Sequence, residues 1–551
     1  MDLPRLTFAE AGLFLILVAA PLAITPFSAA PFEDAKLVLV VAGALLVWTA
    51  RLHIDRRMLL VAGTWVVATT IAAALGVEPA IGLTAAIGSS GGGLIVTLAT
   101  ATFVVAGAGL PDHLAARGAR FLLGAGLTVS AIGIVFRLFP DFPAPILAGQ
   151  SANAATFGNT LFAVAFVAAA VAVVPGRLAD PRREVVAVAI LVVGAASFGE
   201  RSSYLLPSIA ILVAARRGRV GPRRSAMLIG TTIVVLVAWA FVEPQLPRRP
   251  GSNRSVSQFV DRTVDSARFT VWNATYEGWT QRPILGWGPG ATRTAYVRGA
   301  TPAQLDDATR RWADAHDLGL EQLVSGGLVT AVPFVALVAL LAARAWRGPR
   351  DRAWALGAAA ALAAYAAFEP MHPLLSPMLG LVAGAAAAPS VFDEEAPARA
   401  RPWIRRAGTI ALAAGLAVSS LMLVASTLER WGTRYGEIWA LRSARALQPW
   451  RQSADITLAF RLAFDGRGDG PGARAAAAEA RSIMADTVAA HPWNVQVRLS
   501  AADLEIYLRD PTAGRAWIVE HVRRFPSDQA ALEAFDRFIA DASATLPVAS
   551  P

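Results

Sequence analysis

One stretch of this sequence, residues 243–318, contains two kinds of side chain that could act on a phosphorylated substrate. Arg268 and the arginines around it could bind phosphate or diphosphate, because a guanidinium donates two parallel hydrogen bonds to such groups. His316, near the end of the stretch, could take a proton from a hydroxyl group as a general base. Arg201 lies elsewhere, in the short polar segment Gly199–Ser203 between two apolar runs. Together these side chains would suit a reaction in which a diphosphate leaves and negative charge develops on it.

An aromatic residue, Trp272, follows Arg268 by four positions, inside a pattern over residues 266–279 that predicts an amphipathic helix. A spacing of four places both side chains on one helix face. Trp272 could stack on a sugar ring, or it could anchor the chain at a membrane surface, where tryptophan is enriched. The anchoring role is the one favoured for it, as for Trp279 and Trp287.

Two further features could contribute to substrate binding. Gly286 and Gly288 belong to a turn-rich run in which the backbone could approach a ligand closely. His372 follows Glu369 in a proline-containing turn, and it could line a cavity for a second substrate.

The surroundings of His316 set its protonation. A helix is predicted to begin near Asp314, and its N-terminus would disfavour the protonated imidazole, whereas the carboxylates of Asp314 and Asp317 would favour it. A neutral imidazole could act as the base. Roles without chemistry remain open: His316 could be an ordinary histidine at the membrane surface. Arg201 could extend to that surface, and Arg268 could lie on a solvated helix.

The composition indicates the kind of protein that positions these residues. Of 551 residues, 55% are hydrophobic and 16% are charged, whereas soluble proteins carry about 25% charged residues. The absence of cysteine excludes disulfides, thiolate nucleophiles and cysteine-based zinc sites. Asp306 and Asp307 lack further ligands at metal-binding spacing, so we expect neither a metal nor a cofactor. The net charge of +10 could suggest nucleic acid, but in a membrane protein the position of the arginines matters more, and we expect no nucleic-acid partner.

Thirteen apolar stretches predict membrane-spanning helices, because about 20 apolar residues cross a bilayer as a helix. The predicted spans are residues 9–27, 35–50, 58–76, 92–110, 119–139, 155–175, 184–199, 202–215, 225–242, 319–343, 353–369, 371–388 and 406–428. They predict an all-α, polytopic membrane bundle over residues 1–428.

Arginine clusters occur on every second connection between these spans, for example within residues 51–57, 177–183 and 216–224. Basic residues mark cytoplasmic loops. The alternation therefore places the N-terminus in the cytoplasm and both the 243–318 loop and the C-terminal tail outside. A loop of this length is expected to fold or to carry function.

The tail, residues 429–551, predicts a separate extracytoplasmic helical domain. Pro449, Pro492 and Pro526 each follow a helical pattern, and the last two are 34 residues apart, which is the period of tetratricopeptide repeats. A glycine-rich stretch at 465–473 is interpreted as a loop insertion in the first repeat. Stacked helical hairpins are therefore expected, with an irregular helical bundle as the alternative. Either would serve to hold a protein partner.

The chain resembles the O-antigen ligase-like membrane family, which also includes lipid-linked glycan polymerases and some protein O-oligosaccharyltransferases. The resemblance covers roughly residues 1–425 in the order of spans and the placement of the large loop. Its short motifs are Arg268 with Trp272, Pro283 with Gly286 and Gly288, His316 ahead of an apolar helix with the pair Gly326–Gly327 ten residues later, and the segment Gly199–Ser203.

This resemblance implies an enzyme of a bacterial plasma membrane that transfers a glycan from an isoprenyl-diphosphate carrier to a lipid, glycan or protein acceptor. The transfer would take place among membrane lipids at the outer face and use neither a metal nor a nucleotide sugar. His316 would be the catalytic residue, with Arg201 and Arg268 on the diphosphate. A polysaccharide transporter or flippase would need paired ionisable residues inside its spans, and these are nearly absent. A membrane scaffold would explain the tail but not the arginine-rich loop.

Overall fold

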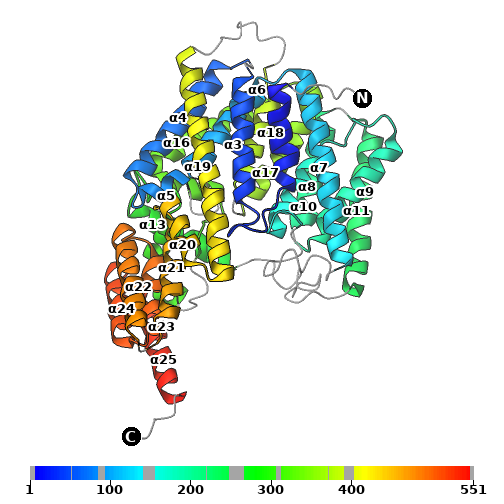
Figure 1. The fold of residues 1–551 in the computed structure, drawn as a ribbon. Coiled ribbons are helices and arrows are strands. Elements are labelled where there is room, and N and C mark those ends of the chain that lie inside the picture. Colours follow the sequence, from blue (N-terminus) through cyan, green and yellow to red (C-terminus); the bar gives the residue numbers. More distant parts are fainter. Residues whose placement is uncertain are drawn as a thin grey trace.

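The computed structural model describes residues 7–50, 53–84, 93–139, 155–200, 202–218, 220–246, 266–305, 312–369, 372–389, 402–468 and 470–545. Within these ranges the regular structure is helical and no strand occurs, as the sequence predicts. Figure 1 shows a large helix bundle with a smaller group of helices, formed by the tail, at one end.

Among the described residues, five helices are long and apolar enough to cross a membrane. They are α4 (Arg56–Leu75), α7 (Asp112–Leu138), α11 (Pro222–Val242), α16 (Leu318–Arg347) and α19 (Pro402–Tyr435). The longest, α19, has 34 residues and is about 51 Å long at the α-helical rise. That length exceeds the hydrocarbon core of a bilayer, which is about 30 Å. These helices support the expectation of a membrane protein.

Each of the other eight stretches predicted as spans contains a shorter helix. These helices are Phe8–Leu22 (α1, η1 and α2), α3 (Asp34–Thr49), α6 (Leu94–Ala108), α8 (Thr160–Val171), α9 (Pro181–Ser197), α10 (Ser202–Arg217), α17 (Ala353–Ala366) and α18 (Leu375–Ala386). The most central is α8, in which every residue from Phe162 to Val171 is buried.

Small residues allow neighbouring helices of the bundle to approach closely. A Cβ atom on Gly107 of α6 would lie 2.3 Å from the carbonyl oxygen of Leu381 on α18. One on Gly384 of α18 would lie 2.2 Å from the carbonyl oxygen of Val104. Such backbone contacts replace the hydrophobic driving force that is missing between helices in lipid.

The described part of the stretch between α11 and α16, residues 243–246, 266–305 and 312–317, is folded, as its length predicts. It contains α13 (Ser266–Thr280), α14 (Thr292–Gly299) and α15 (Pro302–Leu305), and α13 matches the amphipathic helix expected over 266–279. Val271 and Ala274 of α13 are buried against Tyr296 and Val297 of α14. The loop is therefore a small helical layer, and it shares its apolar core with Val495, Phe525 and Ala530 of the tail.

A break in α16 attaches this layer to the bundle. Gly327 has φ 57° and ψ −156°, a backbone conformation open only to glycine. The amides of Leu328 and Val329, which follow the break, donate to the carbonyls of Pro283 (2.9 Å) and Ile284 (3.1 Å). The segment after α13 thus fills the gap in α16.

The tail forms six helices beyond α19. They are α20 (Ile438–Leu447), α21 (Gln452–Asp465), α22 (Pro471–Ala490), α23 (Val495–Tyr507), α24 (Pro511–Arg524) and α25 (Gln529–Thr545). The helices α20, α22 and α24 end just before Pro449, Pro492 and Pro526, as the sequence predicts, and the glycine-rich stretch contains the link between α21 and α22. Leu458, Leu462, Ile483 and Leu504 lie in their shared core.

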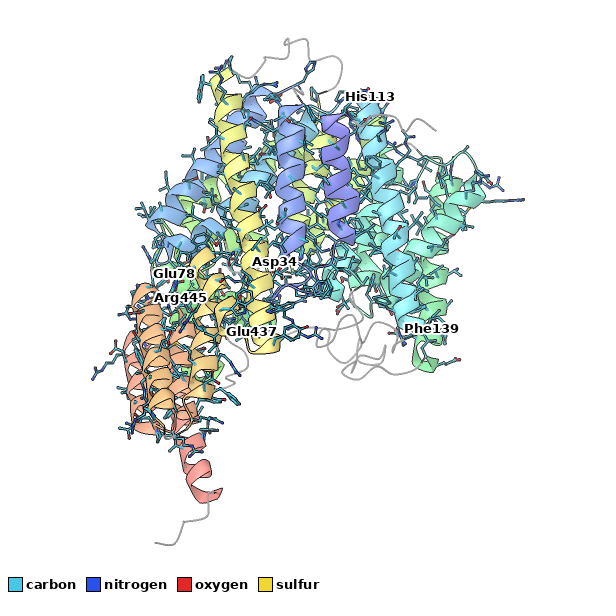
Figure 2. All side chains as sticks on the ribbon, in the orientation of Figure 1. Asp34, Glu78, His113, Phe139, Glu437 and Arg445 are labelled. Carbon is cyan, nitrogen blue, oxygen red and sulfur yellow. The ribbon has the colours of Figure 1, made fainter. Side chains whose placement is uncertain are left out.

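The tail packs against the loop layer through Trp493. The Trp493 ring lies 6.1 Å from that of Trp287, centroid to centroid, and the Trp493 carbonyl accepts a hydrogen bond of 2.8 Å from Thr294 of α14. The neighbouring His491 lies with Nδ1 3.5 Å from the carboxylate of Glu78 in the bundle. Figure 2 shows Glu78 at the boundary between the bundle and the tail. The tail is therefore docked on both other parts of the molecule.

Candidate functional site

Arg268 and Glu369 form an ion pair at the end of the bundle that faces the loop layer. Arg268 lies in the first turn of α13, and Glu369 follows α17, where its amide donates to the carbonyl of Tyr365. The Glu369 side chain is 7% exposed, while that of Arg268 is 33% exposed. A buried carboxylate is costly unless a cation or hydrogen bonds compensate it. The pair thus compensates Glu369 and leaves the guanidinium accessible from one side.

His316 lies beside the same carboxylate. Its Nδ1 is 3.6 Å from Oε2 of Glu369, and its Nε2 is 3.3 Å from Oδ1 of Asp314. The ring of Trp312 packs on it at right angles, with centroids 4.8 Å apart. The imidazole is 17% exposed. The imidazole is therefore flanked by two carboxylates and an indole, and part of it is still exposed to solvent.

The backbone of His316 is also unusual. Its φ is +51°, a left-handed conformation that side-chain-bearing residues adopt rarely and at a cost of about 1–3 kcal/mol. The His316 amide donates to Asp314 Oδ1 at 3.1 Å, which stabilises this turn. Strained backbone concentrates at functional sites, where the surrounding structure maintains it.

Three buried polar atoms in this cluster have no hydrogen-bond partner among the described residues: Trp272 Nε1, His316 Nδ1 and Glu369 Oε2. Buried polar atoms in native proteins are nearly always paired, and each exception needs an explanation. His316 Nδ1 and Glu369 Oε2 lie 3.6 Å from each other, just beyond hydrogen-bond distance, so a small movement would pair them. Trp272 Nε1 is the atom of the three that a polar ligand would satisfy.

The polar segment before α10 lies near the same cluster. Tyr365, on α17, lies within electrostatic range of four charged residues from separate parts of the chain. They are Glu369, Asp314, Glu200 and Arg268. Glu200 accepts a hydrogen bond of 2.5 Å from Thr160 at the start of α8. The neighbouring Arg201, predicted to bind diphosphate, lies outside the described residues.

Glu321 supports the turn that carries His316. It is buried in the first turn of α16 and accepts hydrogen bonds from Thr292 Oγ1 (2.5 Å), the Ala315 amide (3.0 Å) and Ser325 Oγ (3.3 Å). One carboxylate therefore connects α14, the 312–317 turn and α16. The helix itself begins at Leu318, with Asp317 as its cap, and not near Asp314 as predicted, because the chain at His316 is left-handed.

Two of the tryptophans differ in their surroundings. Trp272 is half-buried between Phe269 and Phe368, with ring centroids 5.3 Å and 6.2 Å away, and so lies next to Glu369. Trp287 is buried and donates to the Gly278 carbonyl at 2.8 Å. The expectation that Trp287 anchors the chain at a membrane surface is wrong, because Ala291, Ala295 and Val324 enclose it together with Trp493 of the tail.

Gly286 and Gly288 make their close approach to protein and not to a ligand. Their φ values are +65° and +102°. A Cβ on Gly286 would lie 2.5 Å from the carbonyl oxygen of Val324, and one on Gly288 would lie 3.0 Å from Cα of Gly76. Both glycines therefore join the loop layer to the bundle, which differs from the ligand contact expected for them.

His372 is fully buried. Its Nδ1 accepts a hydrogen bond of 3.1 Å from the Leu374 amide, and its ring lies 4.8 Å from that of Phe162. The turn before α18 thus folds the imidazole of His372 into the bundle, and the expectation that it lines a cavity for a substrate stays a prediction.

Sequence reasoning missed two carboxylates of the cluster, Glu369 and Glu321. Each is an acidic residue at the edge of an apolar stretch, and such residues mark functional sites in membrane proteins. That signal was available. The partners of the two carboxylates could not be predicted, because they lie across the contact between the loop layer and the bundle.

No protein-family model matches this chain, and no curated protein matches it at a significant level. A function is therefore inferred from the arrangement of Arg268, His316 and Glu369.

Proposed function

We propose that this chain is a membrane glycosyltransferase that moves a glycan from an isoprenyl-diphosphate carrier to an acceptor at the outer face of a bacterial plasma membrane. One observation carries the proposal: Arg268 and His316 meet at the carboxylate of Glu369. A cation suited to diphosphate and an imidazole suited to proton transfer thereby lie in one partly open cluster.

In this mechanism Arg268 binds the diphosphate leaving group. A guanidinium has five N–H donors, so Arg268 can keep Glu369 and still donate to phosphate oxygens. The charge that develops as the sugar–phosphate bond breaks would be stabilised by these donors. Arg201, next to Glu200, is proposed as the second diphosphate ligand.

His316 acts as the general base and takes the proton of the acceptor hydroxyl. The imidazolium formed in this step is favoured by the adjacent carboxylates of Glu369 and Asp314. The deprotonated oxygen then attacks the anomeric carbon while the diphosphate leaves from the opposite side. A single displacement of this kind inverts the anomeric configuration. Trapping of a covalent glycosyl-enzyme would contradict it.

The proposed topology has thirteen membrane crossings. The arginine-rich connections face the cytoplasm, which places the site, the loop layer and the tail outside. Isoprenyl-diphosphate glycans would then reach the cluster from the outer leaflet. The tail is proposed to be a tetratricopeptide-like module that contacts a protein partner. The acceptor would be a lipid or protein in a ligase or O-oligosaccharyltransferase, and a growing glycan in a polymerase.

A cell-based exchange of residues tests the proposal. The chromosomal copy is replaced by His316→Ala or by the control His113→Ala, with membrane expression verified. His113 is exposed, and Figure 2 places it at the opposite end of the bundle. We expect His316→Ala to remove the transferred glycan and to accumulate its isoprenyl-diphosphate precursor, and His113→Ala to change neither. Undiminished transfer in His316→Ala would overturn the proposed base.

A further inference from the structure

The outward face of α19 keeps its apolar character beyond the length of a membrane span. The exposed or half-exposed side chains on this face follow one another at intervals of three and four residues, which is the spacing of a single helix stripe. They are Leu421, Val424, Leu428, Trp431 and Tyr435. Along the stripe the aliphatic residues give way to aromatic ones.

The tryptophans near the two ends of α19 are separated by about the thickness of a bilayer. Trp403, near the start of α19, is also exposed, and it precedes Trp431 by 28 positions, or about 42 Å along a helix. A bilayer including its headgroups is about 40–45 Å thick. Figure 2 shows Glu437, just beyond α19, at the same end of the bundle as Phe139 and opposite His113. Trp403 and Trp431 thus match the two surfaces of one membrane.

The first helix of the tail carries a further exposed aromatic residue. The chain turns at Gly436, which has φ +74°, and α20 then packs back on α19, where a Cβ on Gly432 would lie 2.6 Å from Leu441. Trp439 of α20 is 58% exposed, close to the values of 50% for Trp431 and 56% for Tyr435. Three exposed aromatic rings therefore lie on one tightly packed hairpin.

The charges beside these rings suit a lipid surface. Arg430 and Arg434 are exposed, and the Arg434 guanidinium lies 5.6 Å from the centroid of the Tyr435 ring. Neither arginine forms an ion pair with a carboxylate in the described parts of the chain. Aromatic rings with neighbouring cations are typical of the headgroup layer, where the rings are half-solvated and the cations reach phosphates.

We propose that Trp431, Tyr435 and Trp439, named here the aromatic hairpin, lie in the outer headgroup layer of the membrane and hold α20 against it. The partner of this surface is lipid, because the stripe continues the exposed apolar side of α19, which carries Ile410, Leu421 and Val424. The tail would then be held at the membrane by two attachments, the aromatic hairpin and the contact of Trp493 with the loop layer. The side of the membrane rests on the proposed topology, whereas the contact with lipid does not depend on the proposed reaction.

Spin labelling can locate the aromatic hairpin, because the chain has no cysteine and each introduced cysteine is unique. Single variants Trp439→Cys and Tyr435→Cys are labelled with a nitroxide and reconstituted in phosphatidylethanolamine vesicles with a minor fraction of phosphatidylglycerol. Ile410→Cys, exposed within the predicted span of α19, is the control for lipid, and Ala475→Cys, exposed on α22, is the control for water. The readout is collision with oxygen relative to a water-soluble nickel complex, which reports depth.

We expect the labels at 435 and 439 to give oxygen-to-nickel ratios between those of the two controls, severalfold above the ratio at 475. Ratios equal to that at 475 would overturn the proposal, because the hairpin would then lie in water. Disulfide-linked dimers of Trp439→Cys at a low protein-to-lipid ratio would also overturn it, since a second copy of the chain would occupy the surface in place of lipid.

Discussion

Arg268 and Glu369 are 101 positions apart in the chain, and their ion pair joins the first turn of α13 to the end of α17. Glu369 lies 3.6 Å from His316 through its second oxygen. The carboxylate therefore positions both residues proposed to act on the substrate. It would hold the guanidinium at the leaving group and stabilise the imidazolium that forms during proton transfer.

Glu369→Gln should lower the rate of glycan transfer by about 100-fold or more, the range found when a catalytic base loses its support. The amide keeps the volume of the side chain but removes the charge that both neighbours face. Initial rates in reconstituted vesicles measure the effect, with His113→Ala as the control. An unchanged rate, with the variant folded, would remove Glu369 from the mechanism.

Thr292→Val should loosen the turn that carries His316. The change deletes the hydroxyl that donates to Glu321, and the lost hydrogen bond should cost about 1 kcal/mol of stability. Transfer should fall several-fold, and hydrogen exchange in residues 312–317 should become faster. Thr280→Val is the matched control, because the Thr280 hydroxyl is exposed and donates only within α13. Equal exchange in the two variants would argue against this role of Glu321.

Gly286→Ala should destabilise the protein by more than about 2 kcal/mol, because alanine tolerates a positive φ poorly and its Cβ would meet backbone atoms. The readout is the temperature at which the detergent-solubilised protein loses its monodisperse peak in size-exclusion chromatography. Gly63→Ala on α4 is the control, since no atom lies within 4 Å of a Cβ placed there. We expect that control to be neutral or slightly stabilising. Equal midpoints for the two variants would show that the close contacts of Gly286 carry little energy.

Trp493→Ala should separate the tail from the loop layer. Trp493 contacts Trp287, Phe525 and the guanidinium of Arg524, and removing a largely buried aromatic ring costs about 3 kcal/mol. Because Trp312 belongs to the same apolar cluster, hydrogen exchange around His316 should accelerate and transfer should fall. Phe538→Ala, an exposed aromatic on α25, is the control. A variant that lost only acceptor preference would indicate a recruiting tail without a structural role.

Asp455 gives the tail a defined dependence on pH. Burial raises the pKa of its carboxyl above the usual 3.8, and this outweighs the ion pair with Arg445 and the hydrogen bond from Thr487. The folded tail therefore holds this proton more tightly than the unfolded chain does. The resulting stabilisation is complete below pH 3.8 and is lost as the pH rises through the raised pKa. Asp455→Asn cannot ionise, so the stability of the wild type relative to this variant should decrease over that interval, measured by thermal unfolding. A pH-independent difference would contradict the assignment.

The helices could be read from the sequence, and the contacts between them could not. Apolar runs and turn residues predicted α13 and a helix in each expected span, because these depend on local pattern. The partners of Trp287 and His372 depend on tertiary packing. Trp493 of the tail packs on Trp287, and the turn before α18 buries His372. Gly286 was recognised as a position of close approach, but its partner, the break at Gly327, requires a contact between two segments. Arg268 and His316 were recognised by residue type, whereas the carboxylate between them emerged only from the fold.

The contacts of Trp493 and His491 have a consequence for biosynthesis. Translation completes residues 268–369 well before it reaches the tail. A nascent chain that stops before residue 491 would therefore contain Arg268, His316 and Glu369. It would lack Trp493, which belongs to the same apolar cluster as Trp312. The loop layer can attain its final arrangement only after the last helices have been synthesised and have packed on it. Synthesis of the tail would thus act as a checkpoint that delays the proposed activity.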